Sequence, residues 1–347
     1  MRAVSIIHKP TGDTTMRPTF RKSIVLVIGI LAIAAATHAA PATTSSPAIF
    51  ADPPTVFAPG IISRASHEAA PAFTPDGRTV YFQRSTPSES TILVSHHVNG
   101  HWSKPVIASF SGKWSDMEPA MAPDGSYLIF SSSRPIAPGG APIDGFFNGK
   151  RHPGQGGNLW RVDRHGNGWG KPYRLPAIIN SGTSVFAPSI AGDGSLYFIH
   201  PDKSTGHFRL YRSQWRNGHY LPPAPLPFST GATTDVDPAV DPDERFLVFG
   251  SGRKPAASID LFIVFRGKNG WGKPVHMGTI VNSPGSDAEP RLSPDEQTLY
   301  FSSERLVPSH FPRTRQQAER DNAAASVWNN GQYNIWKTPL APWVCHA

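Results

Sequence analysis

The chain has 347 residues, with 33 Lys and Arg, 25 Asp and Glu and a formal net charge of +8. Its single cysteine excludes an intramolecular disulfide framework, and a chain of this length buries a sizeable core without one. The basic residues are scattered along the sequence, so we expect no nucleic-acid partner.

The N-terminus predicts an export signal. A basic stretch around Arg21 precedes the apolar run 24–36, and small residues up to Ala39 then form a cleavage site. An apolar run this short does not suit a bilayer-spanning helix, which needs about 20 residues. We therefore expect residues 1–39 to be a cleaved signal peptide, with an uncleaved anchor as the alternative. The mature protein is then periplasmic or secreted and has no stable membrane span.

Residues 40–54 are rich in Pro, Ala, Ser and Thr and predict a flexible lead-in. After them, one sequence motif recurs, which consists of a proline, a turn similar to Pro-Asp-Gly and an apolar run. Its copies align on Pro71, Pro119, Pro188, Pro238 and Pro290. A second phrase, Asn-Gly followed closely by an aromatic residue, recurs between them at Asn99, Asn167, Asn217 and Asn269. Such self-similarity indicates a repeat architecture.

Each copy predicts four antiparallel strands, because apolar and polar residues alternate and the turn signals are those of hairpins. Four-stranded repeats around an axis form a β-propeller, an all-β fold. We expect five blades, with six as the alternative. The last repeat lacks a fourth strand, so residues 55–63 should close it as its outer strand. No segment shows sustained helical periodicity, and we expect one domain over residues 55–342 with a tail at 343–347.

The repeat phrase resembles the WD40-like Pro-Asp repeat of exported bacterial proteins, the TolB-type β-propellers. The resemblance covers about residues 55–340 and implies a propeller fold. It implies little about function, because a fold this widely shared serves many activities.

Strand order places a candidate site on one face, which we call the insertion face. The connections into the first strands and the loops after the second strands lie there, opposite the Pro-Asp-Gly turns. Two long insertions, about 135–157 and 306–332, belong to the same face. The candidate ligand-binding residues are the acids that precede the repeat prolines, residues that end second strands and two adjacent aromatics of the first insertion: Glu68, Asp116, Glu118, Asp235, Asp237, Asp287, Glu289, Arg134, His200, Arg253, Arg305, Phe146 and Phe147.

Two interpretations of these residues stay open. The repeated acids and arginines either form ion pairs that stabilise the fold, which we call clasps, or belong to a ligand site. The third repeat lacks the acid and has His200 in place of the arginine. Phe146 and Phe147 either bind a partner or plug the channel. We expect no cofactor and no metal, because no His pair with ligand spacing supports one.

The leading functional hypothesis is a monomeric, non-catalytic propeller that binds a protein, peptide or glycan at one face. The alternative is a carbohydrate-active enzyme such as a glycosidase, which needs two free carboxyl groups across a sugar. Acids that are all tied to arginines or backbone amides would argue against that alternative, and a free buried pair would favour it.

Overall fold

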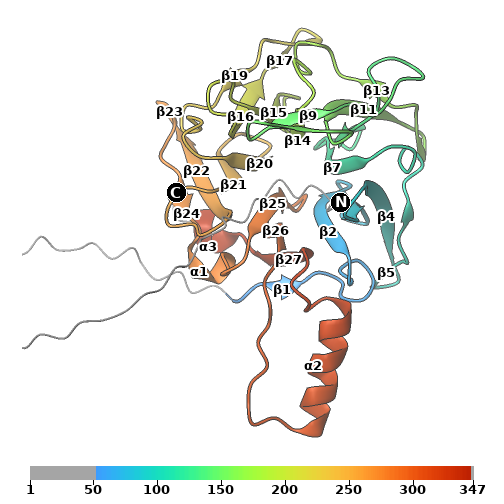
Figure 1. Ribbon diagram of the computed structural model, residues 1–347, viewed down its shortest axis with the longest axis vertical. Helices are drawn as coiled ribbons and strands as arrows, with labels where there is room; N and C mark the ends of the chain where they lie inside the picture. The colour runs from blue at the N-terminus through green and yellow to red at the C-terminus, as the bar shows by residue number, and fades with distance from the viewer. Residues whose placement is uncertain (1–51, 345–347) are drawn as a thin grey trace, which may run out of the picture.

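The computed structural model describes residues 52–344 and shows a five-bladed β-propeller of four-stranded antiparallel blades. The inner strands surround a common axis (Figure 1): β2 (His67–Phe73), β7 (Asp116–Met121), β14 (Phe186–Ile190), β20 (Asp235–Val240) and β25 (Asp287–Leu292). The predicted fold class and blade number are confirmed. The predicted signal peptide lies outside the described residues.

Second and third strands follow the inner strand of each blade in chain order. The second strands are β3 (Thr79–Ser85), β8 (Tyr127–Ser132), β15 (Leu196–Pro201), β21 (Phe246–Ser251) and β26 (Thr298–Ser303). The third strands are β4 (Ser90–Val98), β11 (Asn158–His165), β16 (Phe208–Ser213), β22 (Asp260–Gly267) and β27 (Asn334–Pro339).

The outer strands differ from the continuous strands that the sequence predicts, because each is broken into short pieces. The pieces are β5 (His101–Trp102) and β6 (Val106–Ile107), β12 (Gly168–Trp169) and β13 (Tyr173–Arg174), β18 (His219–Tyr220) and β19 (Ala224–Pro225), and β23 (Gly270–Trp271) and β24 (Val275–His276). In the third blade, β18 pairs with β17 (Trp215–Arg216). Prolines lie between the pieces, at Pro105, Pro172, Pro222 and Pro274. A proline has no N–H to give to a ladder and is tolerated at sheet edges.

The ring is closed by the N-terminal segment, as predicted. β1 (Thr55–Val56) pairs antiparallel with β27, with Val56 opposite Trp336. The Phe57 N–H then donates to the Ile335 carbonyl at 2.8 Å. The two ends of the described chain thus share one blade, which removes an exposed sheet edge.

The core lies between neighbouring blades. One phenylalanine at the same place in every second strand is fully buried or nearly so: Phe82, Phe130, Phe198, Phe249 and Phe301. The aromatic residues after the Asn-Gly turns reach the preceding blade. Trp169 donates to the Tyr81 hydroxyl at 2.8 Å, and Trp271 packs edge-on against Tyr197 at 6.4 Å.

Every inner strand contains a β-bulge that the sequence did not reveal. The residue before the repeat proline adopts a left-handed backbone, with φ between 49° and 55°: Ala70, Glu118, Ala187, Asp237 and Glu289. A side chain in this region costs about 1–2 kcal/mol, so each bulge needs compensating contacts. The bulge turns these residues toward the centre of the ring.

The all-β fold includes three short helices that the sequence did not predict. α1 (Gly278–Val281) and α3 (Ala341–Val344) are single turns, whereas α2 (Arg315–Val327) spans 13 residues of the second insertion. α2 begins with a capping box, in which the Thr314 side chain accepts from the Gln317 N–H and the Gln317 side chain accepts from the Thr314 N–H. No residue of α2 is buried, so its sequence has no apolar stripe with helical periodicity. None of the helices in residues 52–344 is long and apolar enough to span a bilayer.

Candidate functional site

The outer acids of four blades close four similar clasps on the insertion face. Each clasp joins the acid at the start of an inner strand to an arginine, which lies within β3 in the first blade and just after the second strand in the other three. The shortest N–O distances are 2.7 Å for Glu68–Arg84, 2.6 Å for Asp116–Arg134, 2.7 Å for Asp235–Arg253 and 3.1 Å for Asp287–Arg305. The four carboxylates are buried.

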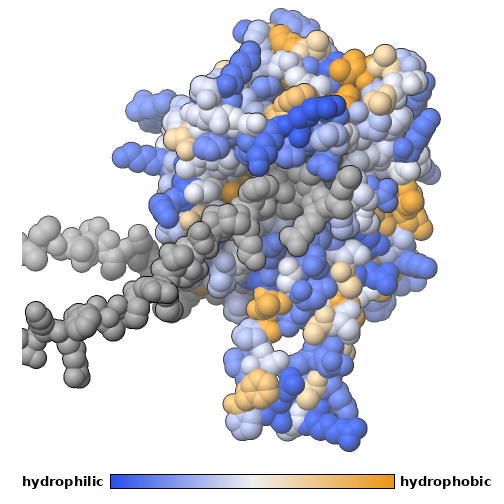
Figure 2. Space-filling model, viewed as in Figure 1, coloured by the Kyte–Doolittle hydropathy of each residue, from blue (hydrophilic) through white to orange (hydrophobic). Residues whose placement is uncertain are grey.

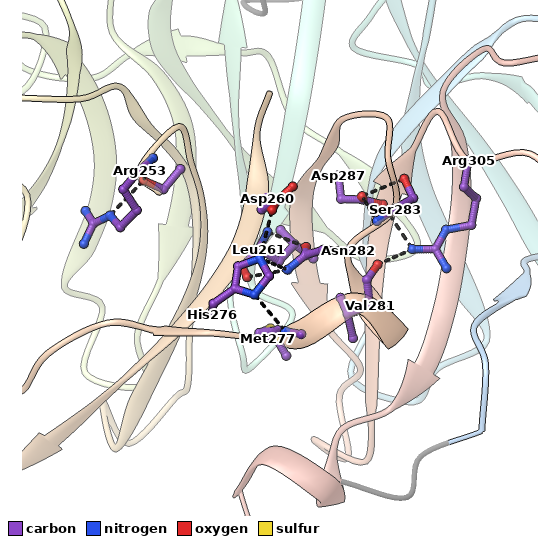
Figure 3. Close-up of polar contacts among 12 residues, drawn as sticks. Arg253, Asp260, Leu261, His276, Met277, Val281, Asn282, Ser283, Asp287 and Arg305 are labelled. Atoms are coloured by element: carbon purple, nitrogen blue, oxygen red, sulfur yellow. Dashed lines mark hydrogen bonds and ion pairs between the residues drawn. The ribbon is translucent and has the colours of Figure 1, made fainter. Parts of the chain in front are cut away.

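Each clasp also holds the chain segment that enters its blade. Figure 3 shows Asp287 between Ser283 and Arg305, with the Arg305 guanidinium donating to the Val281 carbonyl. The Ser283 N–H donates to Asp287 Oδ2 at 2.6 Å. Arg134 likewise donates to the Phe110 carbonyl at 2.6 Å. An acid–arginine pair thus recurs in four blades, and each outer acid has an ion-pair partner within the protein.

The third blade replaces the clasp with a different ion pair. His200 stands at the position of Arg84 in the first blade and of Ser132 in the second, and its Nδ1 lies 2.7 Å from the Pro201 carbonyl oxygen. Burial lowers the pKa of His200. Arg209 of β16 donates to Asp202 at 2.8 Å and to the Ser229 carbonyl at 2.6 Å, in the segment that enters the fourth blade. Within residues 52–344, no group of three or more His, Cys, Asp or Glu side chains is arranged to hold a metal ion.

The inner acids form a second set, because the bulges turn them toward the axis of the propeller. Glu118 accepts the Ala187 N–H of the next blade at 2.6 Å and the Ser131 hydroxyl at 2.7 Å. Asp237 accepts the Glu289 N–H at 3.2 Å. Glu289 in turn accepts the Ser302 hydroxyl at 2.9 Å. The acids therefore stabilise the left-handed bulges by hydrogen bonds between blades.

The inner acids are unusually hard to ionise. Burial, followed by repulsion from Asp237 and Glu118, raises the pKa of Glu289 to about 8. Burial and the neighbouring Glu118 raise the pKa of Asp237 to about 7, and burial raises that of Glu118. A glycosidase needs carboxyl groups that face a sugar, whereas these carboxyls are buried and their oxygens accept protein hydrogen bonds.

The first insertion is divided between the core and the surface. β9 (Gly145–Phe147) and β10 (Lys150–His152) form a hairpin at its tip. Adjacent residues of a strand face opposite sides, so Phe147 is buried against Phe186 and Phe208 while Phe146 exposes 56% of its surface. The insertion also covers a cavity of about 30 Å³, lined by Met117, Phe186 and several small residues.

A larger cavity lies on the axis at the Pro-Asp-Gly face, opposite the insertion face. Its volume is about 150 Å³, and all five inner strands contribute to its walls. Arg291, which the sequence analysis did not single out, also lines it. The signal was present in the sequence: the residue after the repeat proline is small in the other blades, at Ala72, Ala120, Ser189 and Ala239.

A histidine–aspartate pair in the fourth blade has a counterpart at the same place in the second blade. His276 Nε2 lies 2.8 Å from Asp260 Oδ2 and 3.0 Å from Asn282 Nδ2 (Figure 3). In the second blade, Arg174 and Asn158 make the corresponding contact at 2.7 Å. One blade thus uses His and Asp where another uses Arg and Asn. Because the residue types differ while the place is the same, we interpret the pair as a support for the loop before the next blade.

No family model and no curated protein matches the chain. Among solved structures, it is similar to TolB from Acinetobacter baumannii, with 19% identity and a TM-score of 0.40, covering 65% of this chain and 46% of that one. It is also similar to a putative TolB from Agrobacterium tumefaciens, with 14% identity and a TM-score of 0.46, covering 79% of this chain and 91% of that one. A third similar structure is a GH43_12 protein from a capybara gut metagenome, with 12% identity and a TM-score of 0.46, covering 82% and 53%.

Two of these neighbours carry the name TolB. The chain spans about half the length of the Acinetobacter protein. Matches this distant share a fold and carry no conclusion about function.

Proposed function

We propose that this chain is an exported, non-catalytic binding protein that holds a protein partner on the insertion face of its propeller. One observation supports the proposal: the acids of this face are engaged in clasps, while apolar side chains of both insertions stay exposed. Phe146 of the first insertion exposes 56% of its surface, and Phe311 of the second exposes 75%. Aromatic residues are enriched in protein interfaces and among the residues that contribute most to binding.

The second insertion adds surface without adding core. We call residues 306–332 the arm; it includes α2, which projects away from the blades (Figure 1) and buries none of its residues. Figure 2 shows the arm as mostly hydrophilic, with hydrophobic residues interspersed. A helix of this length is marginal in water on its own, and tertiary packing normally supplies its stability. A helix held out from the fold therefore suits contact with a partner.

The base of the arm is anchored, which makes it a defined surface. The Val307 N–H donates to Asn329 Oδ1 at 2.7 Å, and Asn329 Nδ2 donates back to the Val307 carbonyl at 2.8 Å. Trp328 packs edge-on against Trp336 of β27. The exposed Phe146 and Phe311 suit a protein partner, because aromatic residues are enriched in protein interfaces.

The test is quantitative affinity capture from the native cell envelope with three baits. The first is the wild-type propeller, the second carries Phe146→Ser and Phe311→Ser, and the third carries Val275→Ser as a matched control. Val275 exposes 54% of its surface but lies on the outer strand β24. We expect at least one protein to be retained by the wild type and the control and lost by the double variant. Equal retention by all three baits would refute the proposal.

Export has its own test, because it concerns residues 1–39. Expression in a Gram-negative host followed by mass spectrometry of the periplasmic fraction should give a mature N-terminus near Ala40. Recovery of a chain that retains residues 17–39 would contradict cleavage.

A further inference from the structure

The first insertion presents an exposed aromatic side chain on an anchored hairpin. The turn between β9 and β10 consists of Asn148 and Gly149, with φ values of 50° and 69°, as a tight two-residue hairpin turn requires. The Phe146 N–H donates to Ser184 Oγ at 2.7 Å, and the Asn148 N–H donates to the Gly206 carbonyl at 3.1 Å. These contacts fix the hairpin to the third blade, so Phe146 is held outward with 56% of its surface exposed.

The acids next to this hairpin are already paired with arginines. Asp144 accepts from Arg151 Nε at 2.7 Å and from the Gly154 N–H at 2.8 Å. Asp202, in the loop that contacts the hairpin turn, accepts from Arg209 at 2.8 Å. Each of these carboxylates therefore balances the charge of one arginine and is not available to a lysine.

Two lysines beside Phe146 have no partner of this kind. Lys150 of β10 and Lys203 of the loop that contacts the turn are both exposed. Neither forms an ion pair with any residue of the described chain. At the other end of the insertion, Glu89 and Lys113 are also unpaired, but their charges are opposite and balance each other. The hairpin thus keeps the positive charges of Lys150 and Lys203 uncompensated beside an apolar ring.

A protein that covers Phe146 also meets these two lysines. A cation that loses water without gaining a carboxylate is costly, whereas complementary charges at the rim of an interface speed association and select the partner. We therefore propose that the partner of the insertion face is an acidic protein, which packs an apolar patch on Phe146 and places carboxylates opposite Lys150 and Lys203. This inference rests on the proposed function, because it names the chemistry of the same partner.

A protein is favoured over an anionic bilayer, which would attract the same lysines. The Asp144 side chain is 27% exposed and pairs with Arg151, which lies directly opposite Phe146 in the hairpin. A flat layer of anionic headgroups would meet this carboxylate together with the lysines, whereas a folded partner can leave it in water. A single aromatic side chain also gives a bilayer little apolar surface to bury.

The test is a fluorescence-anisotropy titration of the full propeller with a labelled probe peptide in which glutamate alternates with leucine. Two comparison peptides carry glutamine or lysine in place of glutamate. In 50 mM NaCl we expect the glutamate peptide to bind at least tenfold more tightly than either of them. In 500 mM NaCl its affinity should fall at least fivefold, because salt screens exposed charges. No binding of the glutamate peptide, or equal binding of all three, would overturn the inference.

Variants tie the attraction to the hairpin. Lys150→Glu combined with Lys203→Glu should weaken the glutamate peptide at least tenfold. Lys268→Glu combined with Lys273→Glu makes the same change of net charge at exposed positions beside the β22–β23 turn, on the opposite face, and should change the affinity less than threefold. Phe146→Ser should weaken the peptide and leave its salt dependence unchanged. Equal effects of the two lysine pairs would show that net charge alone attracts the peptide, and would refute the proposal.

A fourth bait in the affinity capture separates this inference from the proposed function. The bait with Lys150→Glu and Lys203→Glu should lose the same protein that the Phe146→Ser and Phe311→Ser bait loses. Retention of that protein would leave the proposed function intact and overturn the acidic partner. If no retained protein depends on Phe146 and Phe311, the proposed function fails, and the peptide titration still decides whether the hairpin selects acidic chains.

Vesicles of phosphatidylglycerol and phosphatidylcholine test the bilayer directly. We expect the wild-type propeller to stay in solution when such vesicles are floated through a density gradient. Flotation of the wild type that is lost with Lys150→Glu and Lys203→Glu would assign the hairpin to a membrane surface and overturn the assignment to an acidic protein.

Discussion

Replacing Glu289 by glutamine should make the propeller more resistant to alkaline pH. Burial raises the pKa of Glu289 from 4.5 to about 8 in the folded protein. The folded state therefore holds a proton that the unfolded state releases at lower pH. The stability that this proton provides is fully present below about pH 4.5 and is lost as the pH rises to about 8.

The size of the effect follows from the same shift. Each pKa unit corresponds to about 1.36 kcal/mol, so ionisation of Glu289 should cost about 4 kcal/mol between pH 5 and pH 9. For a domain of this size, that is about 8 °C in Tm, at about 2 °C per kcal/mol. A glutamine has nearly the same shape and no charge to lose. It should match the wild type at pH 5 and exceed it by about 8 °C at pH 9.

The assay is thermal unfolding followed by circular dichroism at pH 5, 6, 7, 8 and 9 for the wild type and Glu289→Gln. Comparing two variants cancels the other titrating groups, including Glu68, whose pKa burial also raises to about 7. Glu319→Gln changes an exposed carboxyl on α2 and should give a constant Tm difference. A Tm difference for Glu289→Gln that does not grow with pH would refute the argument.

Two further outcomes follow from the structure. Arg134→Ala strands the buried Asp116 carboxylate and should lower the free energy of unfolding by about 3 kcal/mol in urea, whereas Arg315→Ala, in an exposed pair, should change it by less than about 1 kcal/mol; equal effects would contradict the role of the clasps. Deleting residues 52–57 removes β1 and should lower Tm markedly, and an unchanged melt would show that ring closure contributes little.

The repeated features of the fold could be predicted from the sequence because they recur. Five aligned prolines defined the blades, and the missing strand of the last repeat identified its substitute near Thr55. The acids and arginines were placed on one face by strand order alone. The register confirms that placement, with Asp116 opposite Ser132 at the insertion end of β7 and β8.

Features that depend on single residues or on backbone detail could not be predicted in the same way. The left-handed bulge at Glu118 has no local sequence signature, because it is stabilised by hydrogen bonds from a neighbouring blade. Helix α2 lacks a buried face and was not predicted, and the capping box at Thr314 is the one sequence signal that could have indicated it. Phe146 and Phe147 looked equivalent until β9 placed them on opposite sides.

Contacts that recur in most blades differ from residues that occur in one blade only. A contact that the ring needs for closure is needed in most blades, as the four clasps show, and its residues are constrained by that role. Arg291 is different, because the four corresponding positions carry Ala or Ser and no second arginine shares its environment. A small residue would fill that position without the cost of burying a charge. The ring does not require the guanidinium, because the other four blades close around a small residue at this position.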